Sequence, residues 1–213
     1  MNPDDLWKTP VTPTGKVVRL EPLSEAHIPG MALAGRDESI WKYMLYANLS
    51  STGSMAAWVR DMLGRQQAGT DLPFAVIHLA TGRVAGATRY LEMRPLHRSL
   101  EIGGTWYAPE FQRTAVNTEC KYLLLKYAFE EMNCIRVQFK SDARNEHSIR
   151  AIERLGAVRE GVLRNHYILQ DGTLRDSVYF SILDKEWPGV KRRLEDRLVN
   201  QMISCKGSIC QKK

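Results

Sequence analysis

The chain has 213 residues, 44% of them hydrophobic and 25% charged, which is an ordinary globular composition that can bury a substantial core. Most of its net charge of +6 lies after residue 183, where eight Lys or Arg stand against four Asp or Glu. This pattern is typical of a solvated helix face, so we expect no nucleic-acid partner. No apolar run approaches the roughly 20 residues that span a bilayer, so we expect no membrane association either.

The N-terminus and the cysteines bear on the compartment. The chain start lacks the basic residues and apolar stretch of a secretion signal, so we expect a cytoplasmic protein. Cys120 and Cys134 lie in or beside predicted elements, as buried reduced thiols do, and Cys205 and Cys210 lie in a tail without histidine. The five histidines show no metal-ligand spacing, so we expect no metal site.

The first half of the chain contains two helix patterns and four strand patterns. Alternating apolar residues predict an edge strand over 16–22, after which Ser24 caps a first helix. A second, amphipathic helix begins near Ser51. Three strands follow, over 74–79, 84–91 and 100–107; the first is almost continuously apolar, which predicts a strand covered on both faces.

The second half alternates helices and strands and ends in a hairpin. A helix over 118–132, a strand over 136–140 and a helix over 148–155 precede two strands joined by Asp171-Gly172. Together the elements predict an α/β protein with a mixed, mostly antiparallel sheet of about seven strands flanked by helices. We expect one domain over 1–198 and a disordered basic tail over 199–213. The sequence leaves the oligomeric state open, with a homodimer as one outcome.

A loop that opens directly into a helix follows the strand over 100–107. It comprises Gln112, Arg113, Thr114, Ala115, Val116, Asn117 and Thr118. The first backbone N–H groups of a helix have no partner within it, and the helix dipole favours negative charge there. A strand that delivers such a loop predicts a site for a phosphorylated ligand.

Three stretches, in this order and at this spacing, resemble the GCN5-related N-acetyltransferase (GNAT) superfamily and its ribosomal-protein N-terminal acetyltransferase branch. They are Glu101-Ile102-Gly103 leading to Trp106-Tyr107-x-Pro109, the loop 112–118, and Asn145-x-x-Ser148-x-x-Ala151-x-x-x-Leu155-Gly156-Ala157. The resemblance covers about residues 16–187. It implies the GNAT fold, with a sheet splayed at a central strand, acetyl-CoA as the cofactor and a primary amine as the acceptor.

The resemblance also implies where acetyl-CoA binds. A kink at Gly103-Gly104 would part this strand from the next, so that the peptide-like pantetheine arm pairs with the strand through Thr105 and Trp106. The pyrophosphate would then lie on the loop 112–118, and Asn145 would bond the arm. The loop departs from the family by having Ala115 and Asn117 where glycine is usual, and glycine permits positive φ and close backbone approach.

Amine acetylation needs a base for the amine and a proton for the departing thiolate. Glu101 and Glu92 are the candidate bases, and each has the alternative interpretation of a surface strand carboxylate. The position where many relatives carry a tyrosine for the thiolate is Ile152 here, and the related branch uses the serine that matches Ser148. Ser148 is interpreted either as this donor or as a helix N-cap.

Aromatic residues are the candidates for the acceptor pocket. We expect Trp41, Tyr43 and Tyr46, with Tyr167 of the hairpin, to form its wall, although aromatic clusters also form protein cores. The function that the sequence favours is an acetyl-CoA-dependent N-acetyltransferase with direct transfer in a ternary complex. The alternatives are a non-catalytic acyl-CoA sensor of the same fold and, more remotely, a basic nucleic-acid-associated protein.

Overall fold

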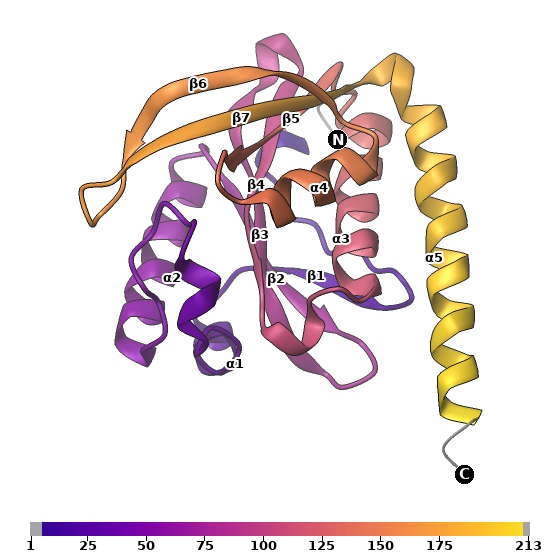
Figure 1. The fold of residues 1–213 in the computed structure, drawn as a ribbon, viewed down its shortest axis with the longest axis horizontal. Coiled ribbons are helices and arrows are strands. Elements are labelled where there is room, and N and C mark those ends of the chain that lie inside the picture. Colours follow the sequence, from indigo (N-terminus) through magenta and orange to yellow (C-terminus); the bar gives the residue numbers. More distant parts are fainter. Residues whose placement is uncertain (1–5, 211–213) are drawn as a thin grey trace.

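A seven-stranded sheet is the centre of the computed structural model, which describes residues 6–210 and side chains up to residue 201 (Figure 1). Its strand order is β1-β2-β3-β4-β5-β7-β6, and only β4 and β5 pair parallel. This arrangement confirms the predicted α/β class and the mostly antiparallel sheet. The strands are β1 (Val18–Pro22), β2 (Leu72–His78), β3 (Arg83–Arg94), β4 (Ser99–Tyr107), β5 (Arg136–Asp142), β6 (Val158–Ile168) and β7 (Leu174–Leu183).

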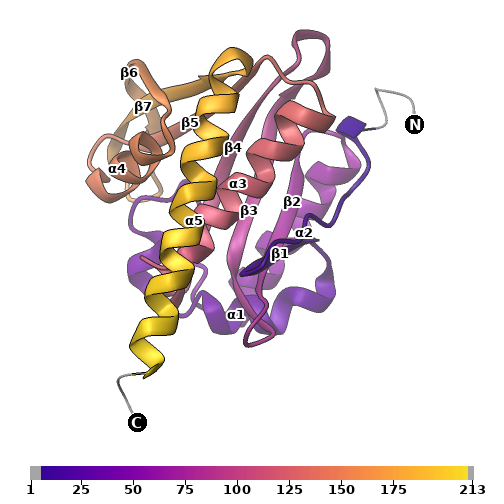
Figure 2. The ribbon, with the colours of Figure 1, turned by 90° about the vertical axis from the view of Figure 1, so that its right-hand side faces the viewer.

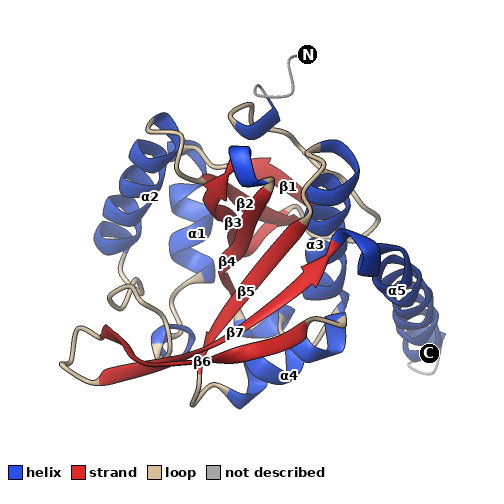
Figure 3. Ribbon diagram, turned by 90° about the horizontal axis from the view of Figure 1, so that it is seen from above, coloured by secondary structure: helices blue, strands red, loops and turns tan. Residues whose placement is uncertain are grey.

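Helices cover both faces of the sheet. They are α1 (Ile28–Ala34), α2 (Thr52–Gln67), α3 (Ala115–Lys126), α4 (Glu146–Leu155) and α5 (Trp187–Cys210). Helices α1 and α2 lie on one face and α3 and α5 on the other (Figure 3), and α5 runs alongside α3 (Figure 2). Strand β2 between them is buried along almost its whole length, as its apolar sequence predicts.

The C-terminal helix extends beyond the predicted domain end. A disordered tail is predicted over 199–213, whereas the backbone of α5 continues as helix to Cys210. Residues 211–213 lie outside the described part of the chain. Within that part, no helix has both the length and the apolar character needed to cross a bilayer.

Strand β4 is kinked at its glycine pair. Gly104 has a φ of +57°, a left-handed conformation that favours glycine, and the pairing of β3 with β4 shifts register at the same point. Beyond the kink β4 leaves β5: the two strands pair only from Ser99 to Glu101, against Arg136–Gln138. The predicted splay at a central strand is therefore present, and it leaves the second half of β4 without a partner on that side.

Helix α3 begins three residues earlier than its hydrophobic pattern predicts. Thr114 is its N-cap, with a hydroxyl that accepts a hydrogen bond from the Val116 N–H. Glu119 fixes the helix to the start of β1 by accepting the backbone N–H groups of Lys16, Val17 and Val18 at 2.6–2.8 Å. These bonds tie α3 to the edge strand β1.

Candidate functional site

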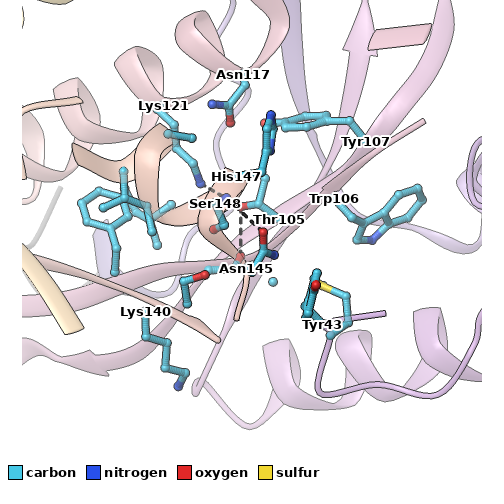
Figure 4. A pocket seen from close by; sticks show the side chains of 18 of the residues that line it. Tyr43, Thr105, Trp106, Tyr107, Asn117, Lys121, Lys140, Asn145, His147 and Ser148 are labelled. Atoms are coloured by element: carbon cyan, nitrogen blue, oxygen red, sulfur yellow. Dashed lines mark hydrogen bonds between the residues drawn. The ribbon is translucent and has the colours of Figure 1, made fainter. Parts of the chain in front are cut away.

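A cavity of about 560 Å³ lies where β4 and β5 part. Residues 101–107 of β4 and 139–142 of β5 line its two sides, and the start of α3, one face of α4 and residues 39, 40 and 43–46 complete the wall. Figure 4 shows the side chains that converge on this space. Its volume falls within the range of small-molecule sites in proteins.

The start of α3 forms one end of the cavity. Arg113 adopts the left-handed conformation, with a φ of +59°, while Ala115 already lies in the helix. The alanine in place of a glycine therefore causes no backbone strain, because the turn is made two residues earlier. The Thr114 hydroxyl also donates to the Phe111 carbonyl at 2.7 Å, which fixes the entry to the helix.

Positive charge gathers around the same end. Arg113 and Arg154 both line the cavity, and both act on His147 at the start of α4. Partial burial lowers the pKa of His147, and the charges of Arg113 and Arg154 lower it further. Guanidinium groups beside a helix N-terminus suit a phosphate group.

The start of α4 separates the roles of two predicted site residues. Asn145 is the N-cap, because its Oδ1 accepts the Ser148 N–H at 3.0 Å. This leaves the Nδ2 group of Asn145 as its donor for a ligand. Ser148 is not the cap, and it lines the cavity beside Asn145 (Figure 4).

The two candidate bases lie in different surroundings. The Glu101 side chain is 1% exposed, lines the cavity, and accepts a hydrogen bond from Gln138 Nε2 at 3.1 Å. Burial raises the pKa of the Glu101 carboxyl, and the nearby Lys140 ammonium partly opposes that rise. The Glu92 side chain is 51% exposed, forms an ion pair with Arg94, and is absent from the cavity lining.

Three of the four aromatic candidates for the acceptor pocket reach it directly or through a neighbour. Tyr43 and Tyr46 line the cavity. Tyr167 does not, but its hydroxyl accepts a hydrogen bond from Lys140 Nζ at 3.2 Å, and Lys140 lines it. Trp41 is buried in the core, with its ring 5.0 Å from that of Trp106, so it supports the wall from behind.

Every residue predicted to bind acetyl-CoA lines the cavity except Ala115 and Val116. Val116 packs into the core with 1% of its surface exposed. Within the described residues, no group of three or more His, Cys, Asp or Glu is placed to hold a metal ion.

The structure adds charged residues that the sequence does not single out. Arg89, Lys121, Lys140 and Arg175 line the cavity, and all four are largely removed from solvent. Lys121 lies on α3 with 6% of its surface exposed, and its Nζ donates to Thr105 Oγ1 at 2.7 Å. The one signal in the sequence was a lysine in a helix segment otherwise rich in buried residues, which is easily interpreted as a surface position.

Comparisons with known proteins agree with this geometry. The family model described as "Acetyltransferase (GNAT) domain" matches residues 18–158. A solved structure from T. thermophilus, described provisionally as an acetyltransferase, superposes with a TM-score of 0.81 at 41% identity, covering 90% of this chain and 99% of that one.

Two curated relatives match about half of this chain. YdaF of Bacillus subtilis (strain 168), whose name provisionally calls it a ribosomal N-acetyltransferase, is 34% identical over 53% of this chain and 61% of its own length. Spermidine N(1)-acetyltransferase of Escherichia coli (strain K12) is 26% identical over 50% of this chain and 56% of its own length. The chain thus spans less than two thirds of these relatives.

Proposed function

The chain belongs to the acetyltransferase (GNAT) family, and we propose that it transfers an acetyl group from acetyl-CoA to a primary amine, directly and within a ternary complex. The observation that carries this proposal is one cavity that joins three features: an unpaired stretch of β4, the capped start of α3 and a buried carboxylate, Glu101. A sensor would need the first two features, whereas only a catalyst needs the third.

The described residues fit acyl-CoA as the donor. A side chain at Gly103 would place its Cβ 2.9 Å from Glu101 Oε1, and one at Gly104 would place it 2.6 Å from the Tyr46 hydroxyl, so the glycines keep the strand surface open. The free backbone groups of β4 would pair with the amides of the pantetheine arm, as an added strand does. The start of α3 with Arg113 would hold the pyrophosphate. When bound, acetyl-CoA supplies the acetyl group as an activated thioester.

Glu101 is the proposed base. An ammonium has no lone pair for attack, so a proton must leave the acceptor before or during the transfer. Burial raises the pKa of the Glu101 carboxyl, which makes the carboxylate more basic than an exposed one, and the Lys140 ammonium partly opposes that rise. Glu92 lacks both the burial and the position, so we assign it no direct part in proton transfer.

The charges around the acceptor favour an α-amine over a polyamine. Arg89 is paired with Asp71 and Lys140 with Glu101, and Asp142 is paired with Arg144. Arg175 also lines the cavity, and among the described residues no carboxylate lies within ion-pair distance of it. A second ammonium on the acceptor would therefore meet unfavourable charge. An α-amino group has a pKa near 7.7–8.0 and supplies a neutral nucleophile at physiological pH more readily than a lysine-like amine does. We accordingly propose a protein N-terminus or a small amine with one positive charge as the acceptor.

The domain and compartment are part of the same proposal. We propose a single catalytic domain over 1–198 and a cytoplasmic location, for which the free, buried thiols of Cys120 and Cys134 are suitable. A homodimer remains one proposed state, to be decided by sedimentation.

Two measurements test the function. Saturating acetyl-CoA should raise the melting temperature, since a ligand at 100 times its Kd stabilises a protein by about 2.7 kcal/mol. Free thiol should then appear only when an amine is added, faster with a peptide carrying a free N-terminus than with spermidine. Binding without amine-dependent thiol release would support the sensor instead, and no stabilisation would reject a CoA-linked role.

A further inference from the structure

Lys121 of α3 places a cation between the parted strands β4 and β5. Its Nζ donates a hydrogen bond to Thr105 Oγ1 of β4 at 2.7 Å and lies 5.9 Å from the ring centroid of Phe139 on β5. The Thr105 hydroxyl also forms a hydrogen bond with the Thr88 hydroxyl at 2.8 Å, and this bond fixes the group that accepts from Lys121. The lysine therefore reaches from α3 to both sides of the opening (Figure 4), and Ser148 lines the same cavity.

The ammonium of Lys121 is incompletely satisfied by the protein. It has three N–H donors, and among the described residues only Thr105 accepts from it. No carboxylate in that part of the chain lies within ion-pair distance, although Glu101 acts on it from farther away. A buried cation without a carboxylate partner is costly, so its position in a binding cavity points to an anionic or electron-rich group on the ligand.

We propose that Lys121 is a catalytic residue, whose Nζ binds the thioester sulfur and donates the proton that the departing thiolate requires. This inference rests on the proposed function, since it assigns a role in the same site. The sulfur becomes negative as the acyl bond breaks, and Lys121 is a cation in the gap that would receive the pantetheine arm, without a carboxylate within ion-pair distance among the described residues. Ser148, which lines the same cavity, offers a hydroxyl, which is a far weaker acid than an ammonium.

The acidity of Lys121 suits this role. Burial lowers the pKa of its ammonium to about 8. A thiol such as that of cysteine has a pKa of about 8.5, so a proton can move between the two groups at little cost in free energy.

The step is balanced without another reactant. A C–N bond forms from the neutral amine to the acetyl carbon while the C–S bond breaks, and the electron pair of that bond passes to sulfur. The Nζ of Lys121 gives its proton to the sulfur, and Glu101 takes the surplus proton of the new amide nitrogen. Water then returns a proton to Lys121 and removes one from Glu101, so the products are the amide and the free thiol.

The first test compares Lys121→Met with Lys126→Met, an exposed lysine at the end of the same helix. Lys121→Met should lower kcat by about 10²–10⁴-fold, the usual contribution of a proton donor, whereas Lys126→Met should leave it unchanged. Melting curves of both variants check that each is folded. A kcat of folded Lys121→Met within threefold of the wild type would overturn the proposal.

The second test needs no turnover and begins with the wild type alone. Ultraviolet absorbance of the thiolate, measured against pH and corrected for the unliganded protein, gives the thiol pKa of bound CoA. While Lys121 is protonated, its charge should lower that pKa relative to free CoA, and Lys121→Met should remove the shift. A thiol pKa in the wild type that equals or exceeds that of free CoA would overturn the inference.

The two proposals fail in distinguishable ways. If the wild type binds no CoA, both fall. If it binds CoA and acetylates an amine while its bound thiol titrates as in free solution, only the role of Lys121 falls. A stable acetyl group found on Lys121 by mass spectrometry would also overturn that role, because it would make the lysine an acceptor.

Discussion

Lys140 Nζ lies 3.3 Å from Glu101 Oε1, and both side chains are buried at the point where β4 and β5 stop pairing. The position of this ion pair has a structural cause. Glu101 is the last residue of β4 that pairs with β5. Its partner is Gln138, and Lys140 lies two residues farther along β5. The opening of the sheet thus brings a carboxylate and an ammonium together at the edge of the cavity.

Replacing Glu101 with Gln should remove the base. We expect kcat to fall by about 10²–10⁴-fold, because proton removal from the amine loses its acceptor. Since the base works only when deprotonated, the wild-type rate should decline as pH falls through the Glu101 pKa, which burial raises above the ordinary value. That decline should disappear in the variant. Glu92→Gln separates the two candidates, and a larger loss there than in Glu101→Gln would reverse the assignment.

Replacing Lys140 with Met should shift the acid side of the pH–rate profile. The ammonium lowers the pKa of Glu101, so without it the carboxyl should hold its proton to higher pH. The decline in kcat/KM should therefore begin at a higher pH than in the wild type, and activity should recover as the pH rises until Lys121 loses its proton near pH 8. A profile that keeps its wild-type position would show that Lys140 does not tune this group.

Gly104→Ala should damage both stability and donor binding. Its φ of +57° is strained for alanine, and the new Cβ would lie 2.6 Å from the Tyr46 hydroxyl. We expect a loss of about 1–3 kcal/mol in the free energy of unfolding and weaker binding of CoA by calorimetry. Gly53→Ala is the matched control, because no atom lies within 4 Å of its Cβ position in α2. It should change stability by less than about 1 kcal/mol, toward greater stability.

Glu119→Gln should loosen the start of β1 from α3. The carboxylate accepts three backbone N–H groups, and an amide would turn an NH₂ group toward at least one of them. We expect the free energy of unfolding in urea to fall by roughly 2–3 kcal/mol, since hydrogen bonds to charged groups are the stronger ones. Glu153→Gln on the exposed face of α4 is the control. Equal midpoints for the two variants would contradict this role of Glu119.

The elements of the fold could be predicted because their patterns are local. The apolar run of β2, the glycine pair of β4 and the Asp171-Gly172 turn each determine their own conformation. The hydrophobic pattern locates the start of α3 three residues too late, because it does not reveal that the Thr114 hydroxyl caps the helix. The missing glycine at Ala115 mattered little, since Arg113 makes the left-handed turn.

The site was harder to predict because burial is a property of the tertiary structure. Glu92 and Glu101 both look like strand carboxylates, but a bulge between β3 and β4 leaves Glu92 at a φ of +49° and exposed, while Glu101 faces the cavity. Lys121 looks like a surface lysine in a helix. Only the packing of α3 between the sheet and α5 removes it from water (Figure 2).

A crystal structure with CoA bound tests the central claim most directly. The pantetheine arm should pair with β4 between Gly103 and Trp106, the pyrophosphate should contact the backbone N–H groups of residues 113–118, and the sulfur should lie within hydrogen-bond distance of Lys121 Nζ. Density for the nucleotide elsewhere, or a gap between β4 and β5 closed by side chains, would contradict it.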